Sequence, residues 1–131
     1  MKGFHTHIEE QTTANDHYRK VLYTSKHSQL VLMSLEPGEE IGMEIHQDND
    51  QFFRFDAGEG RVIIDETTYE VKDGDAVVVP AGAQHNVMNT GTEDLKLYTI
   101  YSPAHHKDGI DHVTKEEADS NETEFDGQTS E

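Results

Sequence analysis

This chain of 131 residues reads GEEIGMEIHQDNDQFFRFDAG from Gly38 to Gly58, and that stretch decides its fold. Two runs with strand character, 41–46 and 51–56, enclose the polar residues 47–50. Asp and Asn favour turns because their side chains hydrogen-bond to the nearby backbone. The stretch therefore predicts a strand, a short connection and a second strand.

The alternation of side chains along a strand decides which of these residues face the same way. Residues two apart point to one side of a strand. Glu44 and His46 therefore share a face of the first run. Gln51 shares a face of the second run with Phe53 and Phe55.

A second stretch of the same character reads GDAVVVPAGAQHNVMN from Gly74 to Asn89. His85 and Asn89 lie on one face of its final strand. Strands of about four to seven residues, separated by turn residues, continue through 21–101. No helix is predicted before Thr114, where 114–119 could form one turn. This pattern predicts an all-β antiparallel barrel or sandwich.

The two stretches resemble the sequence motifs of the cupin superfamily. The first cupin motif is written G-x5-H-x-H-x(3,4)-E-x6-G. Its spacing is matched at every position, although two residue types differ. The matching residues are Gly38, Glu44, His46, Gln51 and Gly58.

The second cupin motif, G-x5-P-x-G-x2-H-x3-N, is matched in residue type as well as in spacing. The matching residues are Gly74, Pro80, Gly82, His85 and Asn89. The resemblance covers about 35–102, which is the whole apparent core. It implies a double-stranded β-helix, the jelly-roll barrel of the cupins.

Three regions are expected along the chain. Residues 1–20 are polar and would form an N-terminal arm, and 21–102 would form the cupin β-barrel domain. Residues 103–131 would form a polar, acidic C-terminal tail that is partly disordered. Residues 120–131 bury too little apolar surface to offset the entropy of ordering. Their removal is expected to change the melting temperature by only a few degrees.

The resemblance also implies a metal site. In cupins the side chains at four motif positions bind one metal ion, and here these are Glu44, His46, Gln51 and His85. Glu44 replaces the first histidine of the family, and Gln51 replaces its glutamate. The donor set keeps a total charge of −1 and suits zinc, manganese, iron or nickel. The amide oxygen of Gln51 is a weak ligand that shifts the preference toward harder ions.

A metal-free polar pocket is the alternative at these four positions. Against it stands the cost of burying a carboxylate and two imidazoles without a partner. Phe53, Phe55 and Met43 are expected to line or support the pocket. Glu44 would be the candidate general base if it does not bind the metal.

The remaining histidines carry less information. His5 and His7 lie in a polar segment and are expected to be solvated. The segment 102–109 follows the last barrel strand, so His105 or His106 could reach the mouth of the barrel.

Several residues are expected on the outer side of the barrel. Arg54 alternates with Phe53 and Phe55, so it should face away from the pocket and pair at a subunit contact. Phe52, Tyr98 and Ile100 would add an apolar outer face, and burying such a face predicts a homodimer.

The composition excludes several classes of partner. The formal net charge is −17, and residues 115–131 contribute seven acidic side chains against one lysine. Neither nucleic acid nor an anionic membrane surface would be attracted. There is no cysteine, no apolar run of a signal peptide and no stretch of ~18 apolar residues, so we expect a cytoplasmic protein.

Function does not follow from the cupin fold, because the fold hosts many activities. The leading hypothesis is a small cupin that binds one divalent metal and binds or acts on a small sugar-like or organic-acid-like ligand. One alternative is a zinc-dependent sugar-phosphate isomerase resembling phosphomannose isomerase, although no phosphate-binding residue is evident. Others are an iron dioxygenase and a metal-free small-molecule binding or regulatory module.

Overall fold

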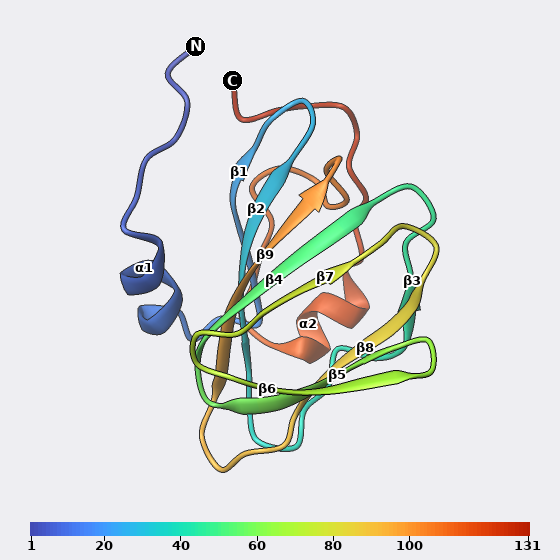
Figure 1. Cartoon of the computed structure of the whole chain (residues 1–131). Coiled ribbons are helices and arrows are strands. Elements are labelled where there is room, and N and C mark those ends of the chain that lie inside the picture. Colours follow the sequence, from blue (N-terminus) through green and yellow to red (C-terminus); the bar gives the residue numbers. More distant parts are fainter.

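The computed structural model describes residues 1–131 and consists mainly of strands in two antiparallel sheets (Figure 1). The strands of the first sheet are β1 (Arg19–Thr24), β2 (Gln29–Leu35), β4 (Asp50–Ala57), β7 (Ala76–Val79), β9 (Leu95–Ser102) and β10 (Asp111–His112). Those of the second sheet are β3 (Glu44–Ile45), β5 (Glu59–Ile64), β6 (Thr67–Lys72) and β8 (Gln84–Asn89).

The order of the strands is β10-β1-β2-β9-β4-β7 in the first sheet and β3-β8-β5-β6 in the second. Neighbouring strands in both sheets are therefore often distant in sequence, as β4 and β9 are. The two sheets face each other and enclose the core (Figure 1). The predicted all-β double-stranded β-helix is confirmed.

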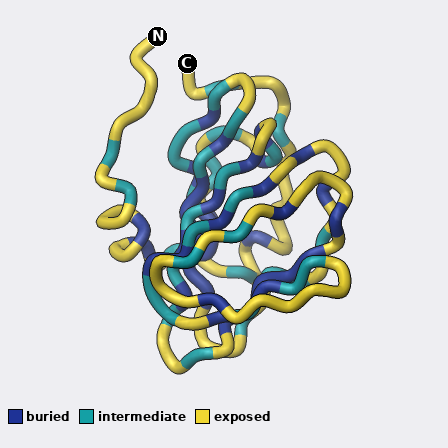
Figure 2. The backbone as a smooth tube through the Cα atoms, in the orientation of Figure 1, coloured by how far each residue is buried: buried dark blue, intermediate teal, exposed yellow.

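The side chains inside the barrel change character along the strands. At one end they are apolar and fully buried, and Met33, Leu97 and Phe55 form one row across β2, β9 and β4. Further along, the inward positions become polar, with Gln51 on β4 opposite Tyr101 on β9. The buried residues lie along the strands of both sheets, whereas the N-terminal segment and most connections are exposed (Figure 2). The barrel thus has an apolar end that supplies packing and a polar end that can supply chemistry.

The N-terminal segment contains a helix that the sequence did not indicate. Helix α1 (Ile8–Ala14) contacts β2, β4 and β9 from outside the barrel. Thr12 is fully buried there, and its hydroxyl donates to the carbonyl of Ile8 at 2.7 Å. The prediction of no helix before Thr114 is wrong. The helix has few apolar residues and is held by its contact with the sheet, which no local pattern reveals.

The C-terminal segment packs on the barrel in this structure. Helix α2 (Lys115–Ser120) overlaps the one turn expected over 114–119. Its N-cap is Thr114, whose hydroxyl accepts a hydrogen bond from the Glu117 amide at 3.1 Å. Ala118 is 1% exposed and belongs to the core. The division of the chain into arm, barrel and tail stays a prediction.

The last eleven residues contact the loop that follows β9. The Lys107 amide donates to the carbonyl of Thr123 at 3.3 Å, and the Phe125 amide donates to the carbonyl of His105 at 3.0 Å. These contacts lie on the surface, so we expect them to hold the loop in place without adding much to global stability.

Deleting residues 121–131 tests this contact. The Lys107 amide loses its acceptor, so its hydrogen exchange should become about tenfold faster or more. The His106 amide donates instead to Oε1 of Gln29 at 3.0 Å, which the deletion leaves in place. Its exchange rate is the internal control. Equal exchange at the Lys107 amide with and without residues 121–131 would show that these residues do not hold the loop in place.

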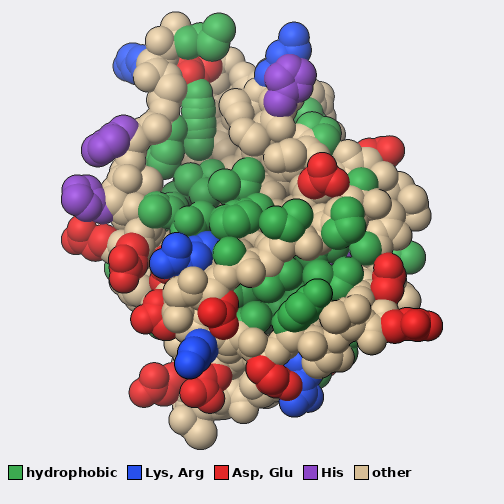
Figure 3. Space-filling model, viewed as in Figure 1, with side chains coloured by type: hydrophobic (Ala, Val, Ile, Leu, Met, Phe, Trp, Pro, Cys, Tyr) green, Lys and Arg blue, Asp and Glu red, His purple; other side chains and the backbone are tan.

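The outer face of the first sheet carries apolar side chains. Phe52 and Tyr98 lie on neighbouring strands with ring centroids 6.2 Å apart, and Phe52 pairs with Ile100. Figure 3 shows hydrophobic side chains gathered over β2, β9 and β4. Arg54 is on the same side and pairs with Asp56 of its own chain, with Nε 3.3 Å from Oδ1. A homodimer through this face stays a prediction. Neither helix has the length or the hydropathy needed to cross a bilayer.

Candidate metal centre

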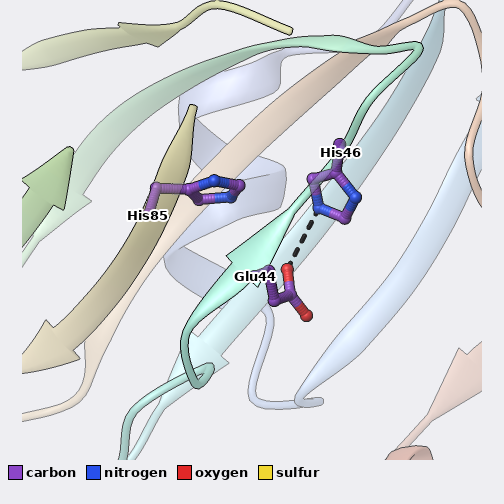
Figure 4. Close-up of side chains that lie close together, drawn as sticks. All are labelled: Glu44, His46 and His85. Atoms are coloured by element: carbon purple, nitrogen blue, oxygen red, sulfur yellow. Dashed lines mark hydrogen bonds and ion pairs between the residues drawn. The ribbon is translucent and has the colours of Figure 1, made fainter. Parts of the chain in front are cut away.

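Three side chains from the two sequence motifs meet at the polar end of the barrel. Glu44 lies on β3 and pairs directly with His85 on β8. His46 follows β3 by one residue, and its carbonyl accepts a hydrogen bond from the Gly82 amide at 2.9 Å. Both motifs are therefore joined at this point by backbone pairing. Figure 4 shows the three side chains pointing toward one another.

The distances between these side chains are those of a possible metal site. One ligand atom of each of Glu44, His46 and His85 lies within 4.8 Å of the others. Nε2 of His46 is 3.1 Å from Oε2 of Glu44 (Figure 4). The imidazole rings of His46 and His85 have centroids 5.2 Å apart. The structure thus brings together three of the four residues predicted as ligands.

His85 is oriented by its own backbone. Its Nδ1 lies 3.3 Å from the carbonyl of Ala83, and a carbonyl can only accept. The proton is therefore on Nδ1, and the lone pair of Nε2 is available. Metal-ligating histidines are commonly fixed in this way by a second hydrogen bond. His85 is 2% exposed, so the surrounding side chains and this hydrogen bond together fix the direction in which Nε2 points.

Gln51 lies on the inner face of β4 and is 2% exposed. Its Nε2 donates to the hydroxyl of Thr99 at 3.0 Å. Its Oε1 is buried and has no hydrogen-bond partner. A buried carbonyl oxygen without a partner is costly and would be satisfied by a cation. Its role as the fourth ligand stays a prediction.

The electrostatics of the triad favour an anionic Glu44 and a neutral His85. Burial raises the pKa of Glu44, but the hydrogen bond and the charge of His46 outweigh it, so the pKa is lowered. Burial also lowers the pKa of His85 and outweighs the hydrogen bond to Ala83. A carboxylate and a neutral imidazole are the forms that bind a metal ion.

The loop after β9 adds a histidine to the surroundings of the triad. The ring centroid of His105 lies 4.2 Å from that of His46 and 5.3 Å from that of Tyr101. His106 is more buried, and its Nε2 lies 3.2 Å from the hydroxyl of Tyr101. Of the two candidates in this segment, it is therefore His105 that lies beside His46 of the triad. The turn residues before it gave no indication of which histidine would reach inward.

The structure agrees with some of the remaining expectations about residues near the site and differs from others. Phe53 is fully buried with its ring centroid 6.3 Å from that of His85, so it supports the site. Met43 is 51% exposed and is not part of the buried wall, because it alternates with Glu44. His5 and His7 are both exposed on the N-terminal segment.

Glu44 is the residue of the triad that is most exposed to solvent. The Glu44 side chain is 33% exposed, whereas that of His46 is 8% exposed. The five main surface hollows, of about 250 to 470 Å³, lie elsewhere and include none of the triad. His46 and His85 are therefore buried, and Glu44 is the member of the triad that reaches solvent.

Acid should destabilise this end of the barrel. Burial lowers the pKa of His105 to about 4 and also lowers that of His85. The unfolded chain binds protons near the ordinary histidine value of 6.5, so it gains protons first as the pH falls. Stability is therefore fully present above about pH 6.5 and is lost between that pH and about pH 4.

Urea unfolding at a series of pH values checks this expectation. His105→Asn should flatten the loss of stability between pH 6.5 and 4. His27→Asn, which changes an exposed histidine, should leave it unaltered. An unchanged slope in the His105 variant would show that this ring does not take up a proton on unfolding.

Comparison with known proteins agrees with the motifs. The family model of the cupin domain matches residues 31–101. YrkC of Bacillus subtilis (strain 168) is 46% identical over 123 residues, which cover 89% of this chain and 66% of YrkC. L612 of Acanthamoeba polyphaga mimivirus is 46% identical over 106 residues, which cover 78% of this chain and 66% of L612. The chain thus spans slightly less than two thirds of the length of these relatives.

A solved structure resembles the whole chain. The crystal structure of BH2720 from Bacillus halodurans superposes with a TM-score of 0.90 and 42% sequence identity. The match covers 92% of this chain and 96% of that one. The likeness therefore extends beyond the barrel to the segments at both ends.

Proposed function

Because the chain belongs to the cupin family, we propose that it binds one divalent metal ion with Glu44, His46 and His85 and uses it to hold a small oxygen-bearing molecule. The observation that carries the proposal is the convergence of three ligand atoms within 4.8 Å inside the barrel. Two imidazoles and one carboxylate are a common donor set for zinc, manganese, iron and nickel.

Gln51 completes this proposed set. Its buried Oε1 has no partner within the protein, and an amide oxygen is a ligand of hard cations. The total charge of the four side chains is then −1, carried by Glu44. Because Glu44 is the most exposed of the triad, the negative charge lies on the side from which an ion or ligand would enter.

A bound ion would act as a Lewis acid on an oxygen of the ligand, such as a carbonyl or hydroxyl of a sugar or an organic acid. The surrounding side chains would exclude water and orient the metal ligands. Phe53 and Tyr101 exclude water from the histidines, since they are 0% and 2% exposed. The hydrogen bond from His85 to Ala83 fixes one ligand, and that between His46 and Glu44 holds the other two together. A cytoplasmic homodimer is part of the proposal.

A metal-free binding module is the second candidate, and one observation favours it. The Glu44 carboxylate already accepts a hydrogen bond from Nε2 of His46, which offsets part of the cost of burial. A metal on that nitrogen would require the proton to move to Nδ1 of His46 and would break this hydrogen bond, so the metal competes with an existing contact.

Elemental analysis and titration with zinc and manganese separate the two candidates. The proposal predicts one ion per chain for the wild type and at least tenfold weaker binding for His46→Ala. Gln51→Ala should weaken binding less, because water can replace a weak amide ligand. His27→Ala is the matched control for loss of an exposed imidazole. Wild-type protein that takes up neither ion would favour the metal-free module.

A further inference from the structure

The loop that follows β9, residues 103–106, is bound by a buried amide side chain. Gln29 on β2 is 1% exposed, and its Oε1 accepts hydrogen bonds from the amides of His105 and His106 at 3.2 and 3.0 Å. Its Nε2 donates to the carbonyl of His106 at 2.7 Å. Buried backbone groups outside helices and sheets need such partners. One side chain thus makes three hydrogen bonds to two consecutive residues of the loop.

A second buried amide, that of Asn49, binds the other half of the same loop. Asn49 is 8% exposed, and its Nδ2 donates to the carbonyls of Pro103 and Ala104 at 2.6 and 3.2 Å. It lies three residues after His46, in the connection between β3 and β4. The segment that carries His46 is therefore hydrogen-bonded directly to the loop.

The loop places the ring of His105 against that of His46. Their centroids are 4.2 Å apart, whereas the rings of His85 and Tyr101 lie 5.2 and 5.7 Å from His46. The other side of His105 is supported as well, since its ring stacks on Tyr101 at an interplanar angle of 28°. His105 is thus the closest of the three rings that pack on His46.

The ring of His46 has few other contacts that orient it. The structure gives it one hydrogen bond, between Nε2 and the carboxylate of Glu44. Because a metal on Nε2 breaks this bond, the packing around the ring must then keep it directed at the ion. His85 differs, since its hydrogen bond to the carbonyl of Ala83 is made by Nδ1 and leaves Nε2 available. His46 is therefore the imidazole that depends more on a neighbouring ring.

We propose that His105 is a positioning residue of the metal centre: Gln29 and Asn49 fix its loop, and its ring holds His46 in the direction that the ion requires. His105 does not bind the ion itself, because the ligand atoms that converge within 4.8 Å come from the triad alone. A supporting group of this kind strengthens binding because the ligand is already oriented when the ion arrives. The inference rests on the proposed metal site.

Titration of the protein with zinc, in competition with a chelator, measures the effect. His105→Ala should weaken zinc binding about tenfold, the lower end of the usual range for groups that support metal ligands. His105→Phe keeps a flat ring but has no ligand atom, so it should bind zinc about as tightly as the wild type. His27→Ala is the control for loss of an exposed imidazole. Equal weakening by the Ala and Phe variants would mean that His105 is itself a ligand, and would overturn the proposal.

Gln29→Met tests whether the buried amide acts through His105. It should weaken zinc binding in the wild-type background and cause no further loss in the His105→Ala background, since residues that act through one another are not additive. Thr24→Val is the matched control, because it removes another buried hydrogen bond of Gln29, from Nε2 to Oγ1 of Thr24 at 3.0 Å, and leaves the loop bonds in place. It should lower the thermal midpoint without changing the affinity for zinc. If Gln29→Met does not fold, Asn49→Ala frees the same loop and takes its place in the cycle.

The thermal midpoint of the metal-free proteins separates positioning from a purely structural role. A lower midpoint in His105→Ala with an unchanged affinity for zinc would overturn the proposal and leave the metal site intact. Additive losses of affinity in the double variant would show that Gln29 does not act through His105, and would overturn that part of it. Failure of the proposed function would appear differently, as absence of zinc uptake by the wild type, and this inference would fall with it.

Discussion

Removing the metal with a chelator is expected to lower the thermal midpoint of the wild type by on the order of 10 °C. An ion at a hundredfold excess over its Kd stabilises the native state by ~2.7 kcal/mol. In a domain of this size each kcal/mol corresponds to several degrees. Returning zinc or manganese should restore the midpoint. Differential scanning calorimetry with matched buffers measures both steps.

His85→Ala should remove most of that restoration, because it deletes a buried ligand whose orientation is already fixed by Ala83. Gln51→Ala should lose less of it. His27→Ala, an exposed position, should behave as the wild type. If the wild type melts at one temperature with chelator, with zinc and with manganese, the metal does not bind and the metal-free module is the better account.

Gly58→Ala should destabilise the fold far more than Gly74→Ala. Both glycines have positive φ, +85° and +93°, and both belong to the cupin motifs, since Gly58 ends the first motif and Gly74 begins the second. At Gly74 an added Cβ meets nothing within 4 Å, so the cost is that of the backbone conformation, about 1–2 kcal/mol. At Gly58 the Cβ would lie 2.5 Å from the carbonyl oxygen of Asp94 and 3.0 Å from the Cα of Leu95.

Those contacts are with backbone atoms, so either the connection between β4 and β5 or residues 90–95 must move. We expect the free energy of unfolding to fall by about 4 kcal/mol. Urea unfolding of the two variants side by side gives the difference. Equal losses would mean that the left-handed conformation alone sets the requirement for glycine at both places.

The barrel was predictable because two kinds of signal agree. Strand alternation placed Glu44 with His46 and Gln51 with Phe53, and the resemblance to the cupin motifs implied that His85 joins them. Pairing of Glu44 with His85 between β3 and β8 confirms that the two motifs meet. Both signals are local, since each depends on residues a few positions apart.

The surroundings of the site were less predictable because they depend on contacts between distant segments. Gln29 is one polar residue at the start of β2, and only its hydrogen bonds show that it binds the loop after β9. His105 reaches His46 through a loop whose path no motif describes. Ala118 enters the core from a segment that is polar and acidic overall. In each case the position of one residue depends on contacts with distant segments, which the residues next to it in the sequence do not predict.

The central claim is that Glu44, His46 and His85 hold a metal ion, and anomalous diffraction tests it most directly. Crystals of the protein grown with zinc or manganese should show one anomalous peak per chain, measured at the absorption edge of the added metal. The account predicts that the peak lies between the carboxylate of Glu44 and the two imidazoles, with Oε1 of Gln51 turned toward it. A well-ordered triad with no peak, and with His46 still hydrogen-bonded to Glu44, would contradict it.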